Sequence, residues 1–278
     1  MGARARRLTG GVAGILAGLL LAAGAGQAGA AVQTASSGGV SATLTYAGTL
    51  YEPGPVTLDI ARDGVVQRLT GFGDAGGDAP AYGVAGPGAV RVRDLDGQGA
   101  PEVLVRLYSG GAHCCTRSAI ATLSPQSGTW SLQTHDWGDA AWVLRDLDRD
   151  GAPELVSWDA RWAYWGGVYA TSPRPIQIWS VRDGALVDVT RAHRAAVLRD
   201  QAAQWRYYAH HRNLRQGLRG VLATYVIDGY SAGRPAAAWT RVYAAYRRPD
   251  RLRFFTALRN RLTRLGYRAA SDPVPPVR

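Results

Sequence analysis

The chain has 278 residues, of which 46% are apolar, with two cysteines and 32 basic side chains against 21 acidic ones. This length allows one large domain or two small ones with a buried core. The composition excludes an intrinsically disordered chain, and the two cysteines exclude a small disulfide-rich scaffold.

Residues 1–30 have the pattern of a secretory signal. Three arginines (Arg4, Arg6 and Arg7) precede an apolar run at 12–23, and the small residues 28–30 supply a cleavage site. The run is shorter than the roughly 20 residues that span a membrane. A twin-arginine signal through Arg6 and Arg7 is the alternative. We therefore expect a secreted or cell-envelope protein without a membrane span after cleavage.

Residues 31–190 are predicted to form a β-rich domain. Turn residues separate short candidate strands at 41–46, 56–60, 65–69, 103–108, 118–123, 129–132, 176–181 and 185–189. The pairs Asp63-Gly64 and Asp183-Gly184 predict hairpins, because these residues tolerate the positive φ of a tight turn. Short strands at this spacing are typical of antiparallel sheets.

Residues 191–278 are predicted to be helical. Apolar residues recur at helical spacing in 236–246 and 252–265, and segments 195–211 and 222–226 suggest two more helices before a loose tail at 271–278. This region has 18 arginines against 4 aspartates, whereas residues 31–190 have 11 arginines against 17 acidic side chains. The arginines could contact anionic envelope polymers or the acidic β-rich domain; no nucleic-acid partner is expected.

One acidic segment occurs twice, 52 residues apart, as DLDGQGAPE at 94–102 and DLDRDGAPE at 146–154. Each copy has oxygen-bearing side chains at positions 1, 3, 5 and 9 and a glycine at position 6. Such a loop directs its oxygens to one point, as Ca²⁺ requires. The predicted metal ligands are Asp94, Asp96, Gln98 and Glu102 in the first loop, and Asp146, Asp148, Asp150 and Glu154 in the second.

The first loop is expected to bind Ca²⁺ more weakly or not at all, because Gln98 replaces a carboxylate. The alternative is that both loops are Asx-type turns that need no metal.

The two loops resemble the calcium loops of FG-GAP or VCBS-type repeats in integrin-α-like β-propellers, over residues 88–160 and more loosely 40–190. The chain is also similar to exported bacterial proteins of unassigned function that share the stretch Tyr108–Cys115. The resemblance implies blade-like sheets and a structural Ca²⁺ ion, but no reaction. Two copies cannot close a propeller of four to eight blades. We therefore expect a mainly β fold with partial or irregular propeller-like antiparallel blades and a C-terminal α-helical appendix.

The two cysteines are adjacent in the segment His113-Cys114-Cys115. In an oxidising compartment they could form a vicinal disulfide, although neighbouring Cα atoms, about 3.8 Å apart, are closer than in ordinary disulfides. Two unpaired thiols are one alternative. A redox, nucleophilic or metal-ligating role together with His113 is another, and a nucleophilic cysteine would need a base such as His135.

Other candidate groups are less specific. Asp136, Asp139 and Asp159 could supply a carboxylate pair for glycoside hydrolysis, and His210-His211 is interpreted as a solvent-exposed helix face. Most aromatic side chains around the second loop are expected in the core, and the remainder could form a platform for a carbohydrate or peptide: Trp137, Trp142, Trp158, Trp162, Tyr164, Trp165 and Tyr169.

The sequence thus favours an exported, non-enzymatic, calcium-stabilised module that binds a protein or a glycan. The alternative is a secreted hydrolase or thiol-redox protein that uses the His113-Cys114-Cys115 turn.

Overall fold

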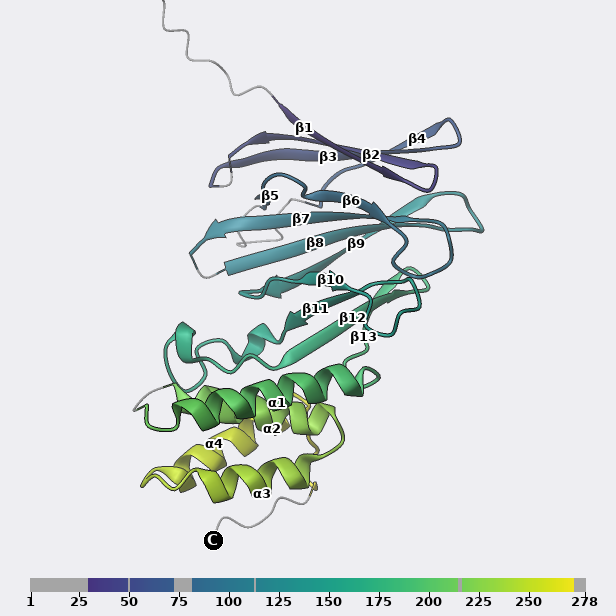
Figure 1. Ribbon diagram of the computed structural model, residues 1–278. Coiled ribbons are helices and arrows are strands. Elements are labelled where there is room, and N and C mark those ends of the chain that lie inside the picture. The colour runs from purple at the N-terminus through teal and green to yellow at the C-terminus, as the bar shows by residue number, and fades with distance from the viewer. Residues whose placement is uncertain (1–29, 50, 73–81, 113, 215–216, 273–278) are drawn as a thin grey trace, which may run out of the picture.

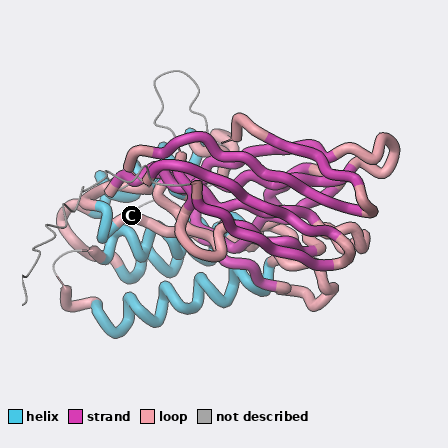
Figure 2. Tube along the Cα trace, turned by 90° about the horizontal axis from the view of Figure 1, so that it is seen from above, coloured by secondary structure: helices cyan, strands magenta, loops and turns pink. Residues whose placement is uncertain are grey.

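The computed structural model describes residues 30–49, 51–72, 82–112, 114–214 and 217–272, without the side chain of Cys114. Almost all of the predicted signal and most of the predicted tail lie outside these residues. Three antiparallel sheets follow one another in chain order, and a layer of four α-helices lies beyond the third (Figure 1). Figure 2 looks down this stack from above, with the helices in cyan partly behind the strands in magenta.

The first sheet is a meander of four strands in sequence order. Its β3–β4 hairpin turns at Asp63 and Gly64, whose φ angles are 51° and 79°, as the sequence predicts. The strands are β1 (Ala31–Ser37), β2 (Val40–Gly48), β3 (Pro53–Arg62) and β4 (Val65–Leu69).

The second and third sheets each contain one of the two Asp-rich loops. The first loop connects β6 to β7, and the second connects β10 to β11. The second sheet comprises β5 (Gly83–Val84), β6 (Val90–Arg93), β7 (Glu102–Gly111), β8 (Cys114–Leu123) and β9 (Trp130–Gly138). The third comprises β10 (Val143–Arg145), β11 (Glu154–Trp158), β12 (Ile176–Arg182) and β13 (Ala185–Asp188), with the 3₁₀ turns η1 (Ala160–Trp162) and η2 (Tyr169–Thr171) between β11 and β12.

Alternating side chains hold the sheets together, because successive residues of a strand point to opposite faces. Leu44 and Leu58 of the first sheet are buried in one cluster with Val105 of the second. Leu104, the neighbour of Val105, joins a separate cluster with Leu155 of the third sheet. A hydrophobic core therefore lies between the first and second sheets and another between the second and third, so the second sheet is covered on both faces.

The helices are α1 (Arg194–His211), α2 (Leu218–Ser231), α3 (Pro235–Ala245) and α4 (Arg251–Arg264). Ala196 of α1 packs against Ile178 and Val189, on the face of the third sheet that points away from the second. Nearly every residue of α2 is buried, so this helix is the centre of the helical layer. Within the described chain no helix has both the length and the apolar content needed to cross a bilayer.

The predicted class, mainly β with a helical C-terminal part, is confirmed, and the strands form three sheets. The described residues show a stack with two ends and no closed barrel or propeller (Figure 1). The sequence prediction missed β1, β5, β6, β10 and β11. Two of these strands have only two or three residues, too few to show an alternating pattern.

Candidate functional site

The two Asp-rich loops have the same backbone geometry. Asp94 accepts hydrogen bonds from the backbone N–H groups three and five residues later, at 2.7 and 2.9 Å. Asp146 accepts the equivalent pair at 2.7 and 3.1 Å. At position 4, Arg149 takes the same left-handed conformation as Gly97, with φ of 69° against 74°. The sequence repeat is therefore a structural repeat, and its first aspartate stabilises the turn.

The glutamates that end the loops are buried. Glu102 and Glu154 are each 3% exposed, and their Oε2 atoms accept hydrogen bonds from the backbone N–H of Leu95 (2.7 Å) and Leu147 (2.9 Å). Burial raises the pKa of Glu102 to about 7, and the nearby charges of Asp96 and Asp94 act in the same direction.

Most of the predicted metal ligands do converge. Oxygen atoms of Asp94, Asp96 and Glu102 lie within 4.8 Å of one another in the first loop, and those of Asp146, Asp148 and Asp150 do so in the second. Gln98 lines the same hollow as Asp96 and Glu102. Both groups consist of oxygen donors alone, so their chemistry fits a hard cation such as Ca²⁺. Glu154 instead groups with Asp148 and His193.

A separate cavity of about 590 Å³ opens between the second and third sheets, beside β9 and β12. Trp179 and Gln177 reach it from the same face of β12, because they are two residues apart on one strand. Three carboxylates named in the sequence analysis, those of Asp136, Asp139 and Asp159, lie around this one cavity. The lining residues are His135, Asp136, Trp137, Gly138, Asp139, Asp159, Ala160, Arg161, Gln177, Trp179 and Asp188.

Aromatic rings form the inner wall of the cavity. The ring centroid of His135 lies 4.3 Å from that of Trp137 and 4.5 Å from that of Trp179. Burial lowers the pKa of His135, although the charge of Asp136 acts in the opposite direction, so the imidazole is neutral at neutral pH. Trp137 is fixed by a 2.9 Å hydrogen bond from its Nε1 to Oγ of Ser118.

Protein donors hold the carboxylates of Asp136 and Asp159 at this cavity. Asp136 accepts hydrogen bonds from the Tyr82 hydroxyl (3.0 Å) and from the backbone N–H of Gly138 (2.7 Å). Asp159 accepts from Nε and Nη2 of Arg161, at 2.8 and 2.7 Å, and from the Tyr267 hydroxyl at 2.8 Å. Both side chains therefore hold neighbouring residues in place.

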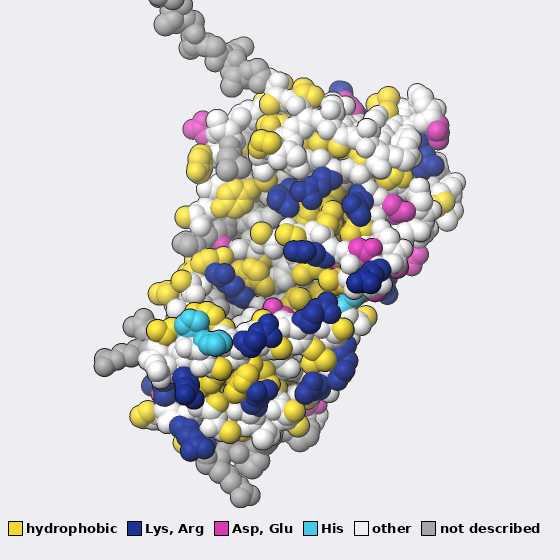
Figure 3. Space-filling view, in the orientation of Figure 1, with side chains coloured by type: hydrophobic (Ala, Val, Ile, Leu, Met, Phe, Trp, Pro, Cys, Tyr) yellow, Lys and Arg dark blue, Asp and Glu magenta, His cyan; other side chains and the backbone are white. Residues whose placement is uncertain are grey.

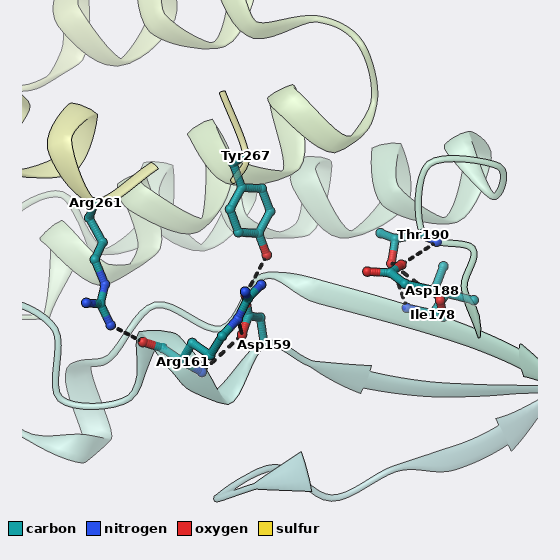
Figure 4. Close-up of polar contacts among 7 residues, drawn as sticks. All are labelled: Asp159, Arg161, Ile178, Asp188, Thr190, Arg261 and Tyr267. Carbon is teal, nitrogen blue, oxygen red and sulfur yellow. Dashed lines mark hydrogen bonds and ion pairs between the residues drawn. The ribbon is translucent and has the colours of Figure 1, made fainter. Parts of the chain in front are cut away.

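The rim of the cavity joins the third sheet to the helical layer (Figure 4). Tyr267, just after α4, reaches Asp159 at the start of η1, and Arg261 of α4 donates to the backbone carbonyl of Arg161. Asp188, at the end of β13, accepts from the hydroxyl of Thr190 at 2.5 Å. A second cavity of about 450 Å³ shares Arg161, Gln177 and Asp188 with the first and adds Arg182 and Arg191.

The other candidate residues that the sequence suggested do not line this cavity. His113 and the side chain of Cys114 are outside the described residues. The disulfide between Cys114 and Cys115 therefore stays a prediction. His210 is exposed near the end of α1, and the ring of His211 stacks on Tyr207 with centroids 4.1 Å apart.

Sequence reasoning missed Trp179, Gln177, Arg161 and Asp188 as parts of one site. The alternation along β12, which places Gln177 and Trp179 on the same face, was the available signal. The approach of this face to β9 depends on the packing of two sheets.

Two curated proteins are similar to parts of this chain. A probable thylakoid lumen protein of Synechocystis sp. is 34% identical over 103 residues, which are 36% of this chain and 30% of that protein. An uncharacterised protein of Sinorhizobium fredii is 29% identical over 150 residues, 53% of this chain and 24% of that protein. The matched segments thus span less than a third of either relative.

No known family profile matches the chain, so the expected membership of the FG-GAP or VCBS-type repeats gains no support from a family match. No solved structure matches it either. What is established is partial similarity to two proteins, one of which is named for the thylakoid lumen.

Proposed function

We propose that this protein is an extracytoplasmic, non-enzymatic module that binds a glycan in the cavity between β9 and β12. The observation that carries the proposal is the wall formed by Trp137, His135 and Trp179 beside a set of polar side chains. The signal pattern of residues 1–30 and the printed name of the Synechocystis relative support the location outside the cytoplasm.

The cavity offers both kinds of contact that a sugar ring needs. A sugar has apolar C–H faces that pack on aromatic rings and hydroxyl groups that hydrogen-bond at its edges. The aromatic wall supplies the first contact, and Gln177 and Asp188 of the third sheet supply amide and carboxylate groups for the second. An aromatic cavity with a few polar groups is also the usual form of a small-ligand site.

Binding without reaction is favoured by the state of the carboxylates. A glycosidase needs one carboxyl to donate a proton and a second one free to act as a nucleophile or base. Asp136 and Asp159 instead accept hydrogen bonds from tyrosine, arginine and backbone donors. We therefore assign them a positioning role, in which they fix the walls of the cavity.

The test is isothermal titration calorimetry with a panel of soluble oligosaccharides, including cell-wall fragments. Trp179→Ala and Gln177→Ala are each expected to weaken binding at least about tenfold, because they remove a stacking face or a hydrogen-bonding group. Tyr207→Ala is the matched control, since Tyr207 is a 48% exposed aromatic residue on α1, outside this cavity. The proposal fails if no glycan binds, or if binding is equally strong in all three variants.

We also propose that the two Asp-rich loops bind Ca²⁺ as a structural ion, through the two groups of oxygen donors described above. Millimolar Ca²⁺ is then expected to raise the melting temperature by several degrees, and EDTA to reverse the shift, because the ion binds the folded chain alone.

Asp96→Asn and Asp150→Asn should each reduce this calcium-dependent shift. Asp63→Asn, in the exposed β3–β4 hairpin, should leave it unchanged. Differential scanning calorimetry measures all three variants. Equal melting temperatures in Ca²⁺ and EDTA would remove the ion from the proposal.

A further inference from the structure

We propose that the second loop and the residue before α1 together form a site for a divalent transition-metal ion, with Asp148, Glu154 and His193 as protein ligands. The site is independent of the glycan cavity. It differs from the calcium groups proposed above because one of its donors is an imidazole nitrogen.

Three separate elements bring these side chains together. Asp148 lies within the second loop, Glu154 begins β11, and His193 is the N-cap residue of α1, which follows β13. One ligand atom from each of the three lies within 4.8 Å of the other two. The loop and the start of the helical layer thus meet at one point, although His193 is 39 residues beyond Glu154 in the sequence.

The imidazole of His193 is the observation that distinguishes this cluster from a set of acidic residues. Its side chain is 9% exposed, it makes no capping hydrogen bond to α1, and its ring takes part in no hydrogen bond within the described residues. Its nearest charged neighbour is Glu154, with Nε2 and Oε1 3.6 Å apart. This separation is beyond the usual range of a hydrogen bond.

The same separation suits two ligands of one ion. With metal–nitrogen and metal–oxygen bonds of about 2.1 Å and tetrahedral geometry, two ligand atoms lie roughly 3.4 Å apart. The arrangement of Nε2 and Oε1 therefore needs only a small adjustment to hold a metal ion between them.

The surroundings provide both a fixed wall and an entrance. Glu154 is 3% exposed, and the backbone N–H of Leu147 holds its other oxygen, as an outer-shell donor does in metal sites. Asp148 is exposed, so an ion can arrive from solvent on its side. Three protein ligands leave the remaining coordination position to water.

The first loop supplies an internal comparison. Its group of Asp94, Asp96 and Glu102 is made of oxygen donors only. Carboxylate sets without nitrogen favour Ca²⁺ or Mg²⁺, whereas imidazole favours zinc and other transition metals. The two loops, so similar in sequence, are therefore proposed to differ in ion preference. Because Asp148 belongs to both groups of the second loop, Ca²⁺ and the transition metal would compete there.

A metal at this site would tie the third sheet to the helical layer. Its ligands come from the β10–β11 loop, from β11 and from the residue that starts α1. Binding to the folded state would therefore stabilise the packing of α1 on the sheet.

The experiment uses the chain expressed without a histidine tag, stripped with EDTA and titrated with ZnCl₂ by calorimetry in 2 mM Ca²⁺. One equivalent of Zn²⁺ is expected to bind. His193→Asn and Asp148→Asn should each weaken this binding at least tenfold; asparagine at position 193 keeps a good N-cap residue, so the fold is retained. Asp96→Asn, in the first loop, should bind Zn²⁺ like the unaltered chain.

The double variant His210→Asn/His211→Asn controls for exposed histidines and should keep the high-affinity equivalent. Co²⁺ serves as a second probe, because its visible absorption reports nitrogen coordination, and this spectrum should disappear in His193→Asn. The proposal is overturned if Zn²⁺ does not saturate one site, if His193→Asn binds it unchanged, or if Ca²⁺ displaces it at equal concentration. In those cases His193 and Glu154 are simply an ion pair.

Discussion

Glu102 and Glu154 occupy equivalent positions in the two loops, but different side chains face them. Both are buried and both accept a hydrogen bond from the residue at position 2 of their loop. Glu154 has the imidazole of His193 3.6 Å away, whereas Glu102 shares its loop with Asp94 and Asp96. The same sequence motif therefore lies in two electrostatic environments, and that of the first loop raises the pKa of Glu102 to about 7.

This shift predicts a pH-dependent stability that Glu102→Gln should change. The ordinary pKa is 4.5, so between about pH 4.5 and 7 the folded chain holds more protons than the unfolded chain. The free energy of unfolding therefore falls as the pH rises through this interval. Glutamine has no charge to bury, and its side-chain oxygen can still accept the hydrogen bond from the backbone N–H of Leu95. In EDTA, Glu102→Gln should melt at least about 3 °C above the unaltered chain at pH 8, with a smaller difference at pH 5.

Calorimetric melts at the two pH values measure this difference. Glu154→Gln is the matched control, because it leaves His193 without its partner carboxylate and should give no gain at pH 8. A gain from Glu102→Gln that is the same at pH 5 and pH 8 would contradict the prediction.

Among the elements, η1 and the segment after α4 are joined by a buried polar contact. Asp159 is 2% exposed and accepts a hydrogen bond from the hydroxyl group of Tyr267, which lies 108 residues later in the chain. Burial raises the pKa of Tyr267 well above its usual value, and the charge of Asp159 adds to this effect, so the phenol stays a donor. The contact connects the end of the helical layer to the rim of the β9–β12 cavity (Figure 4).

Tyr267→Phe is expected to lower the free energy of unfolding by about 2 kcal/mol, because it removes a buried hydrogen bond to a carboxylate. Urea denaturation followed by circular dichroism measures this loss. Tyr208→Phe is the control, since it removes a 3.1 Å bond from a tyrosine hydroxyl to the neutral carbonyl of Ala245 and should cost less. Equal losses in the two variants would show that the contact with Asp159 adds nothing beyond an ordinary hydrogen bond.

The whole molecule is divided by charge as well as by secondary structure. Arginine side chains are spread over the helical layer and extend onto the middle of the molecule on the face shown in Figure 3. Arg253 and Arg264 of α4 are exposed, and neither has an ion pair among the described residues. In the first sheet, by contrast, Arg62 and Arg68 pair with Asp63 and Asp59. We propose that the helical layer is the end of the stack that binds an anionic polymer.

Retention on immobilised polyglutamate tests this partner class. The protein should be held at low salt and released as the salt screens its charges. Arg253→Gln/Arg264→Gln should elute at lower salt than the unaltered chain. The control Arg62→Gln/Arg68→Gln should shift less, because their charges are already balanced by aspartates. An equal shift in both double variants would assign the retention to net charge alone.

Local chemistry made part of this structure predictable. The hairpin at Asp63-Gly64 with the two strands that flank it, the start of α4 after Pro249-Asp250 and the equal geometry of the two loops all depend on residues close together in sequence. Strand β10 has three residues, too few to show an alternating pattern. Helix α2 is buried on all sides, so its sequence does not indicate which face packs against the third sheet.

The sequence by itself determined the change from β to α near residue 190, the pattern of an export signal and the repetition of the Asp-rich turn. Only the tertiary structure decided that Trp179 lies against His135, that Tyr267 reaches Asp159 and that His193 joins the second loop. The physical reason is that a turn or helix is stabilised by neighbours a few residues away. A cavity or a ligand set depends on how separate sheets and helices bury their apolar faces against one another.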